Sequence, residues 1–130
     1  MAKIEDNGRC FACGKENPIG LGLDFQFISQ QFVAKTVVGE NYQSYQGIVH
    51  GGIVTTMLDE AMGGYLFKRG EPAVTGSLEV RYRKPTPTGE PIVIRGWEEQ
   101  RRGKIVRMRS TITLSDGTVA AEGSAKMVLV

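Results

Sequence analysis

The sequence predicts an α+β domain in which one long helix lies on a single curved antiparallel sheet of five to six strands. Three observations predict this fold. Several short runs alternate apolar and polar residues, which is the period of a half-buried strand. One run after His50 instead repeats apolar residues at helical spacing. Glycine, proline and Asp-Gly signals separate the later runs at the intervals that hairpins need.

The first element expected is a strand over Leu21–Phe27, where Leu and Phe alternate with Gly, Asp and Gln. It follows a turn-rich N-terminal extension, residues 1–20. A second short strand is expected near Phe32–Val38, and a polar loop over Gly39–Gln46 leads towards the helix. The length fits one domain, residues 1–130, because domains cluster near about 100 to 150 residues.

The helix is expected to begin at Gly51 and to end between Lys68 and Gly70. Basic residues and a glycine supply stop signals there, and Pro72 follows. Its apolar stripe consists of Ile53, Val54, Met57, Leu58, Ala61, Met62, Tyr65 and Leu66.

Four further strands are expected to pair in chain order as an antiparallel meander. They are Leu78–Tyr82, Ile92–Trp97, Val106–Leu114 and Val119–Leu129. Hairpin turns are expected at residues 101–104 and 115–117, where Asp-Gly is a strong turn signal. A stretch rich in proline, residues 85–91, breaks the chain between the first two strands.

The composition is that of an ordinary soluble globular protein, with 41% apolar residues, 23% charged residues and a net charge of +2. The first residues are polar and lack the apolar core of a signal peptide. No apolar run approaches the roughly 20 residues that cross a bilayer. We therefore expect a cytoplasmic protein without a membrane partner.

Two cysteines, Cys10 and Cys13, form a single C-x-x-C motif. A structural zinc site usually has four protein ligands, which one chain does not supply convincingly. The prediction is two reduced structural thiols and no metal. Zinc shared between subunits and a redox disulfide are the alternatives.

Basic charge is concentrated between Arg81 and Arg109, which hold nine of the sixteen Lys and Arg residues against three acids. These side chains either cover solvated strand faces or form a patch for a phosphorylated ligand. Nucleic acid ranks last and is not expected, because only Tyr82 and Trp97 supply aromatic rings among them.

The glycines that open the helix, Gly51 and Gly52, offer a chemical site. Backbone N–H groups at a helix start lack acceptors within the helix, and the macrodipole is positive there. With no side chain in the way, the Gly52 amide can approach a carbonyl oxygen and stabilise an oxyanion. The alternative is a tight turn that needs glycine flexibility, which is the commoner reason for a Gly-Gly pair.

Asp59 is the best candidate for a general base or nucleophile. On the helix wheel it lies just off the apolar stripe, stacked with Thr55 and Gly63, so that small neighbours leave its carboxylate approachable. Glu60 points elsewhere and is expected to be a surface residue or a member of an ion pair between subunits.

Helix geometry separates the two candidate groups. Gly52 and Asp59 are seven residues apart, and therefore lie on the order of 10 Å apart along one helix. One chain cannot place both on the same carbonyl group. Two copies with antiparallel helices bring Asp59 of one beside Gly52 of the other, in two equivalent sites. A catalytic interpretation therefore requires a dimer.

The run Gly47-Ile48-Val49-His50-Gly51-Gly52-Ile53, followed by Leu58-Asp59-Glu60-Ala61, resembles the signature of hotdog-fold thioesterases of the phenylacetyl-CoA thioesterase (PaaI-like) group. The downstream Thr75-Gly76-Ser77 coincides as well. The order of strands and helix agrees with that fold along nearly the whole chain. Cys10-Phe11-Ala12-Cys13-Gly14 through Asn17-Pro18-Ile19-Gly20-Leu21 resembles the N-terminal extension of one subset of the group.

The resemblance implies hydrolysis of an acyl-CoA to a free acid and CoA. Gly52 N–H would polarise the thioester carbonyl group, and Asp59 of the partner subunit would activate water or attack directly. His50 would orient the loop, in a capping role rather than as a general base. Gln43 would lie near the carbonyl group, whereas Ser44 departs from the asparagine of some relatives. Ser77 would position the water or be an ordinary strand serine.

The resemblance also implies that CoA is the leaving thiol and part of the substrate, so that no separate cofactor is expected. Candidate contacts to substrate or CoA are Gly51, Thr75, Gly76, Arg81, Arg83, Lys84, Arg101 and Arg102. A homodimer is expected, and two such dimers are expected to pair as a homotetramer. The competing interpretation is a non-catalytic acyl-CoA binding or sensing protein on the same fold. A hydratase ranks third, because no second histidine-containing motif is present.

Overall fold

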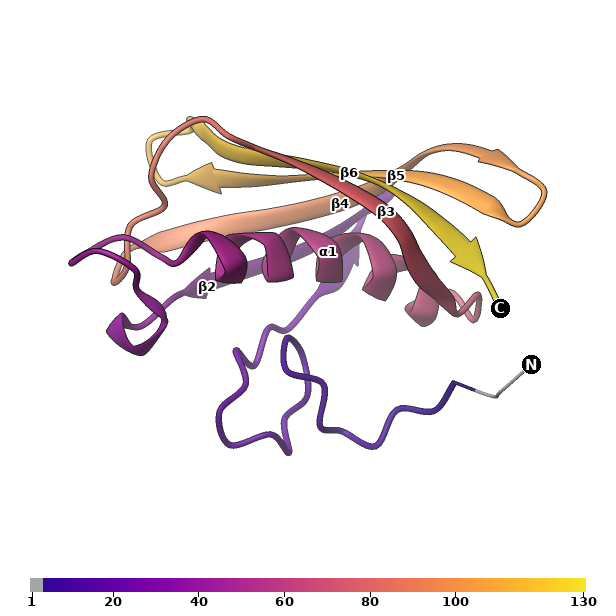
Figure 1. Cartoon of the computed structure of the whole chain (residues 1–130), viewed down its shortest axis with the longest axis horizontal. Coiled ribbons are helices and arrows are strands. Elements are labelled where there is room, and N and C mark those ends of the chain that lie inside the picture. Colours follow the sequence, from indigo (N-terminus) through magenta and orange to yellow (C-terminus); the bar gives the residue numbers. More distant parts are fainter. Residues whose placement is uncertain (1–3) are drawn as a thin grey trace.

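In the computed structural model, which describes residues 4–130, a six-stranded antiparallel sheet curves over one long helix (Figure 1). The helix, α1, spans Gly51–Lys68, and a short 3-10 helix, η1, spans Glu40–Tyr42. The strands are β1 (Gln26–Ile28), β2 (Gln31–Val37), β3 (Ala73–Tyr82), β4 (Pro91–Arg102), β5 (Ile105–Leu114) and β6 (Val119–Leu129). The predicted α+β class, with one helix on one curved sheet, is confirmed.

The strand order, β1-β2-β4-β5-β6-β3, differs from the expected meander of four. β4, β5 and β6 do pair in chain order, but β3 pairs with β6, with Val80 opposite Gly123. The proline-rich stretch, residues 85–91, separates β3 from β4 and also contacts the loop before α1. Val49 N–H in that loop donates a hydrogen bond to the carbonyl of Thr86 at 2.8 Å. The chain thereby crosses past the start of the helix, and β3 is left as an edge strand.

The predicted first strand is mostly not a strand. β1 covers only Gln26–Ile28, because the residues before it bond to the N-terminal extension instead. Leu21 N–H donates to the carbonyl of Phe11 at 2.7 Å, and Leu23 N–H to that of Ala12 at 2.9 Å. Leu23 is nevertheless buried, so that its apolar side chain serves the core from an irregular segment.

The core lies between α1 and the concave face of the sheet. The buried helix residues are Val54, Met57, Leu58, Ala61, Met62, Tyr65 and Leu66, which agree with the predicted stripe except for Ile53, which is partly buried. Gly96 of β4 lets the helix lie this close, because a Cβ there would come within 2.2 Å of the Ala61 carbonyl oxygen. Glycine is therefore required at the crossing point of helix and sheet.

The helix ends as the sequence predicts. Gly70 takes a left-handed conformation with φ of 77°, and Glu71 N–H donates to the carbonyl of Leu66 at 2.9 Å. This is a glycine C-cap, and Pro72 follows it. Within residues 4–130, no helix has the length and apolar character that crossing a membrane demands.

Candidate active site

His50 closes the start of α1 as its N-cap residue. Its Nδ1 accepts a hydrogen bond from Gly52 N–H at 2.9 Å, so that in the neutral ring the proton is on Nε2. The His50 carbonyl accepts from the amides of Ile53 and Val54, which begins the helical hydrogen bonding. The predicted capping role is confirmed. It also occupies the Gly52 amide that was expected to bind a carbonyl oxygen.

The N-terminus of α1 retains its positive character. The first turn contains no acidic residue, and Gly51 N–H donates to no acceptor within residues 4–130. The unpaired amide and the helix dipole together favour a negatively charged or strongly polar oxygen at this end. The Gly51 amide therefore has no acceptor within the described residues, whereas the Gly52 amide is bonded to His50.

Tyr82, at the end of β3, holds the first turn of α1 in place. Its hydroxyl donates to the Gly51 carbonyl at 2.9 Å and lies 2.6 Å from Thr55 Oγ1. The ring remains 57% exposed, so that it forms part of the open surface beside the helix start. The sequence placed Tyr82 in the predicted strand Leu78–Tyr82, on the same face as Leu78 and Val80, but its contact with the helix start was not predicted.

Asp59 is half-buried on the side of α1 that faces β3. Its Oδ1 accepts a hydrogen bond from Thr75 Oγ1 at 2.8 Å, whereas its Oδ2 has no hydrogen-bond donor within residues 4–130. One oxygen is thus fixed and the other is free. This arrangement suits a carboxylate that takes a proton from water or attacks a carbonyl carbon.

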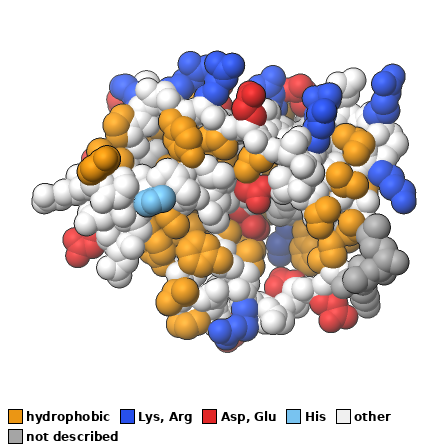
Figure 2. All heavy atoms as spheres, viewed as in Figure 1, with side chains coloured by type: hydrophobic (Ala, Val, Ile, Leu, Met, Phe, Trp, Pro, Cys, Tyr) orange, Lys and Arg blue, Asp and Glu red, His pale blue; other side chains and the backbone are white. Residues whose placement is uncertain are grey.

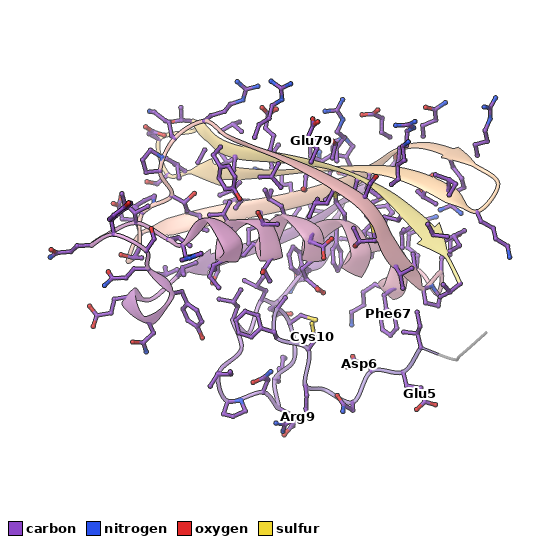
Figure 3. The ribbon with its side chains drawn as sticks, viewed as in Figure 1. Glu5, Asp6, Arg9, Cys10, Phe67 and Glu79 are labelled. Atoms are coloured by element: carbon purple, nitrogen blue, oxygen red, sulfur yellow. The ribbon has the colours of Figure 1, made fainter. Side chains whose placement is uncertain are left out.

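A β-bulge decides which hydroxyl of β3 meets Asp59. The register between β3 and β6 shifts between Thr75 and Ser77, and Gly76 is the extra residue. A Cβ at Gly76 would lie 3.2 Å from the Lys126 carbonyl oxygen. As a result Thr75 faces α1, whereas Ser77 lies on the side of Glu79, which projects from the opposite face of the sheet (Figure 3). Within one chain, Ser77 and Asp59 are not brought together.

Gln43 lies at the end of η1, in the loop that precedes His50. Its Oε1 accepts from Gly47 N–H at 3.3 Å, and the loop is tied to the helix start by a bond of 2.8 Å from His50 N–H to the Tyr42 carbonyl. Gln43 is exposed. The structure therefore places it in the same loop as His50, with its amide oxygen engaged and its amide nitrogen free of partners within residues 4–130.

The basic candidates divide between the two ends of α1. Arg81, Arg83 and Lys84 are close in sequence to Tyr82 and so lie towards the helix start, where Arg83 pairs with Glu122. Arg101 lies near the far end of the helix, since it pairs with Glu71 just beyond the C-terminus, and with Glu98. Arg102 lies beside it in the β4–β5 hairpin. Most of the Lys and Arg side chains seen in Figure 2 lie along the rim over the sheet.

Glu60 does not lie on the open surface and forms no ion pair within residues 4–130, which corrects the expectation of a surface residue. It is half-buried beneath the N-terminal extension, and its Oε1 lies 3.7 Å from Cys10 Sγ. Burial raises the pKa of the Glu60 carboxyl, and Asp59 adds to the shift. The helix wheel placed Glu60 away from Asp59 correctly, but it did not reveal that the extension covers that side.

The family follows from a match to the thioesterase superfamily over residues 46–121, more than half of the chain. The chain belongs to the thioesterase superfamily. The matched segment contains the helix start and Asp59.

This thioesterase superfamily member is 26% identical over 114 residues to mouse (Mus musculus) acyl-coenzyme A thioesterase THEM4, covering 84% of this chain and 49% of that protein. The chain spans about half the length of the curated relatives it matches. A crystal structure of another thioesterase superfamily protein superposes with a TM-score of 0.88 at 25% identity, covering 93% of this chain and 63% of the other.

Two further structures show the same fold at lower identity. A Streptococcus mutans UA159 protein, crystallised bound to acetyl-CoA, gives a TM-score of 0.79 at 22% identity and covers 89% of this chain and 94% of its own. The PaaI protein from the E. coli phenylacetic acid degradation operon gives 0.76 at 16% identity, with 83% of each chain covered. The predicted PaaI-like hotdog fold is thereby confirmed.

Proposed function

We propose that this chain hydrolyses an acyl-CoA thioester to a free acid and CoA, at two equivalent sites in a homodimer. One observation carries the proposal. Asp59 has one carboxylate oxygen fixed by Thr75 and one free, on a helix whose glycine N-terminus keeps an unpaired amide. A carboxylate and an oxyanion-stabilising amide are the two groups that water attack on a thioester requires.

The dimer is needed because the two groups lie on the order of 10 Å apart along one helix. The edge strand β3 supports it. This strand carries Thr75 and Tyr82, and it exposes apolar side chains, with Val74 48% and Tyr82 57% exposed. An unpaired edge with apolar side chains is a surface that a second copy can cover. Pairing there brings Asp59 of the partner subunit towards Gly52.

The reaction balances with these groups alone. Asp59 accepts a proton from water as the water oxygen bonds to the thioester carbonyl carbon. The oxyanion that forms accepts hydrogen bonds from the amides of Gly52 and Gly51, and Gly52 becomes available as its bond to His50 is exchanged for the substrate. The carbon–sulfur bond then breaks, and the CoA thiolate leaves with a proton from the Asp59 carboxyl. In the alternative route the Asp59 carboxylate attacks the carbonyl carbon, the carbon–sulfur bond breaks and the CoA thiolate leaves, and water then hydrolyses the resulting anhydride to the free acid and the Asp59 carboxylate, with the water proton passing to the thiolate.

The two routes differ in the fate of the Asp59 oxygens. In a single turnover with excess enzyme in water enriched in oxygen-18, attack by Asp59 leaves the heavy isotope in the enzyme carboxylate when water opens the anhydride at the aspartyl carbon. General-base catalysis puts it only in the released acid. Heavy isotope in the peptide that contains Asp59, detected by mass spectrometry, therefore establishes attack by Asp59.

Arg81 and Lys84 are the proposed contacts to the CoA phosphates. Both lie towards the helix start, and neither forms an ion pair within residues 4–130. Replacement of either by Ala should raise KM for acyl-CoA more than it lowers kcat, because phosphate binding is the same in the ground and transition states.

A binding or sensing protein on the same fold is the second candidate. A panel of aliphatic and aromatic acyl-CoAs with thiol detection separates the two, with thermal stabilisation measured on the same samples. Hydrolysis predicts thiol release with at least one acyl group. If ligands raise Tm and no acyl-CoA of the panel releases thiol, the chain is a binder and the hydrolase proposal fails.

A further inference from the structure

The C-x-x-C motif of the N-terminal extension folds directly beneath α1 (Figure 3). Cys10 and Cys13 approach Glu60, and the nearest ligand atoms of all three side chains lie within 4.8 Å of one another. We propose that Cys10, Cys13 and Glu60 bind one zinc-class divalent metal ion, which ties the extension to α1.

The separations fit a zinc ion. With Zn–S bonds of about 2.3 Å and Zn–O bonds of about 2.0–2.2 Å, tetrahedral coordination puts two sulfurs about 3.8 Å apart and a sulfur and an oxygen about 3.5 Å apart. Cys10 Sγ and Glu60 Oε1 are already 3.7 Å apart. No pair of ligand atoms exceeds 4.8 Å, so that side-chain movements of about 1 Å close the site.

The backbone of the motif is built as a tight turn. Gly14 N–H donates to the Cys10 carbonyl at 2.8 Å, and a Cβ at Gly14 would lie 2.4 Å from the Cys10 nitrogen and 2.5 Å from the Gly8 carbonyl oxygen. Only glycine fits. Ala12, between the cysteines, is buried and bonded to Leu23. The two thiols therefore converge because the turn is fixed, and the ligand cluster is preorganised on its protein side.

Glu60 is also held in place. Gly64, one helical turn later, leaves space for it, since a Cβ there would come within 2.9 Å of Glu60 Oε2. No Lys or Arg of residues 4–130 forms an ion pair with Glu60, and the negative charges of Asp59 and Asp6 act on its carboxyl group. Even a half-buried carboxylate without a cationic partner is costly to ionise, and a divalent cation would supply the missing positive charge.

Cys10 Sγ donates a hydrogen bond to Glu60 Oε1 in this structure, and the deprotonated cluster would offer a metal ion a mixed sulfur and oxygen donor set. Two thiolates and a carboxylate select zinc over magnesium or calcium, which prefer oxygen ligands alone. Three protein ligands leave a fourth position, which water fills. Because the metal binds thiolates, its binding displaces the thiol protons.

The decisive measurement is the zinc content of the reduced chain, residues 1–130. The protein is purified in a non-thiol reductant, analysed by elemental mass spectrometry, then stripped and titrated with Zn²⁺ against a chelating indicator. We expect one zinc per chain. Co²⁺ in place of zinc should give thiolate-to-metal charge-transfer absorption, and Zn²⁺ should raise Tm of the stripped protein.

Cys10→Ser, Cys13→Ser and Glu60→Gln should each weaken zinc binding by at least about tenfold, since each removes a ligand. Glu5→Gln, in the same extension but exposed and remote from the cluster, is the matched control and should bind as the wild type does. A reduced wild-type chain that takes up no Zn²⁺ overturns the proposal, whether or not the variants fold. Unchanged affinity in folded Glu60→Gln overturns the three-ligand site.

Discussion

Replacement of Asp59 by Asn is the most informative single change in the proposed active site. Asn has nearly the same shape as Asp, and its carbonyl oxygen can still accept the hydrogen bond that Thr75 Oγ1 gives to Asp59 Oδ1 at 2.8 Å. The exchange removes the charge and the basicity of the group while keeping its packing. A loss of activity therefore reports chemistry rather than a rearranged helix.

The expected loss follows from the role. A positioned general base contributes about 10²- to 10⁴-fold to the rate. At about 1.36 kcal/mol for each factor of ten, this corresponds to roughly 3 to 5 kcal/mol of transition-state stabilisation. The free energy of unfolding should change by no more than about 1 kcal/mol, because a hydrogen bond is weakened rather than left without a partner.

The assay is CoA release from the best acyl-CoA of the panel, measured as kcat/KM for wild type, Asp59→Asn and a control. Asp24→Asn is the control, because Asp24 is exposed and makes no hydrogen bond within residues 4–130. Asp59→Asn should lose at least about 100-fold, mainly in kcat, and Asp24→Asn should match the wild type. A folded Asp59→Asn protein within threefold of wild-type kcat/KM would refute the role of Asp59.

Three other substitutions test the local geometry. Thr75→Val should lower kcat/KM about tenfold, because it removes the hydrogen bond that positions the Asp59 carboxylate. Ser77→Ala should lower kcat/KM less, because Ser77 lies on the opposite face of the sheet. Equal losses in kcat/KM would contradict the conclusion that the bulge turns Thr75, and not Ser77, towards Asp59. His50→Ala should lower the free energy of unfolding by about 1 kcal/mol in denaturant titrations, through loss of the N-cap, and His50→Asn should restore most of it. Gly96→Ala should lower the free energy of unfolding by about 3 kcal/mol or more, because the added Cβ would lie 2.2 Å from the Ala61 carbonyl oxygen. A variant with the Tm of the wild type would show that the helix can move away from the sheet without loss of stability.

The helix and its chemistry were predictable because they depend on short-range patterns. The apolar repeat that starts after His50 predicted the beginning of α1, and the basic residues and Gly70 predicted its end. The helical wheel placed Asp59 and Glu60 on different sides of the apolar stripe. Strand pairing was predicted less well. Alternation shows that a segment is a strand but not which strand it pairs with, so the place of β3 beside β6 depended on a crossover that no local signal records.

Two assignments in the site could not be made from the alternation of apolar and polar residues alone. The bulge at Gly76 changes which side chains of β3 face α1, so that Thr75 and not Ser77 contacts Asp59. A glycine inside a strand is a known sign of a bulge, and this shift was therefore open to prediction. The contact between Cys10 and Glu60 joins residues fifty positions apart, and nothing in the local sequence announces it.

Asp59 and Glu60 point about 100° apart around α1 and contact different neighbours, which makes the two proposals separable. Asp59 faces β3 and its free edge, where a second subunit would complete the active site, whereas Glu60 faces the N-terminal extension. Loss of the metal should therefore act first on the anchoring of the extension. Stripping zinc from the wild type should lower Tm and speed proteolysis within residues 4–20, and Asp59→Asn should still bind one zinc while it fails in turnover. If Asp59→Asn instead loses zinc and activity together, the two carboxylates belong to one coupled site, and the division of α1 into a catalytic and an anchoring side is wrong.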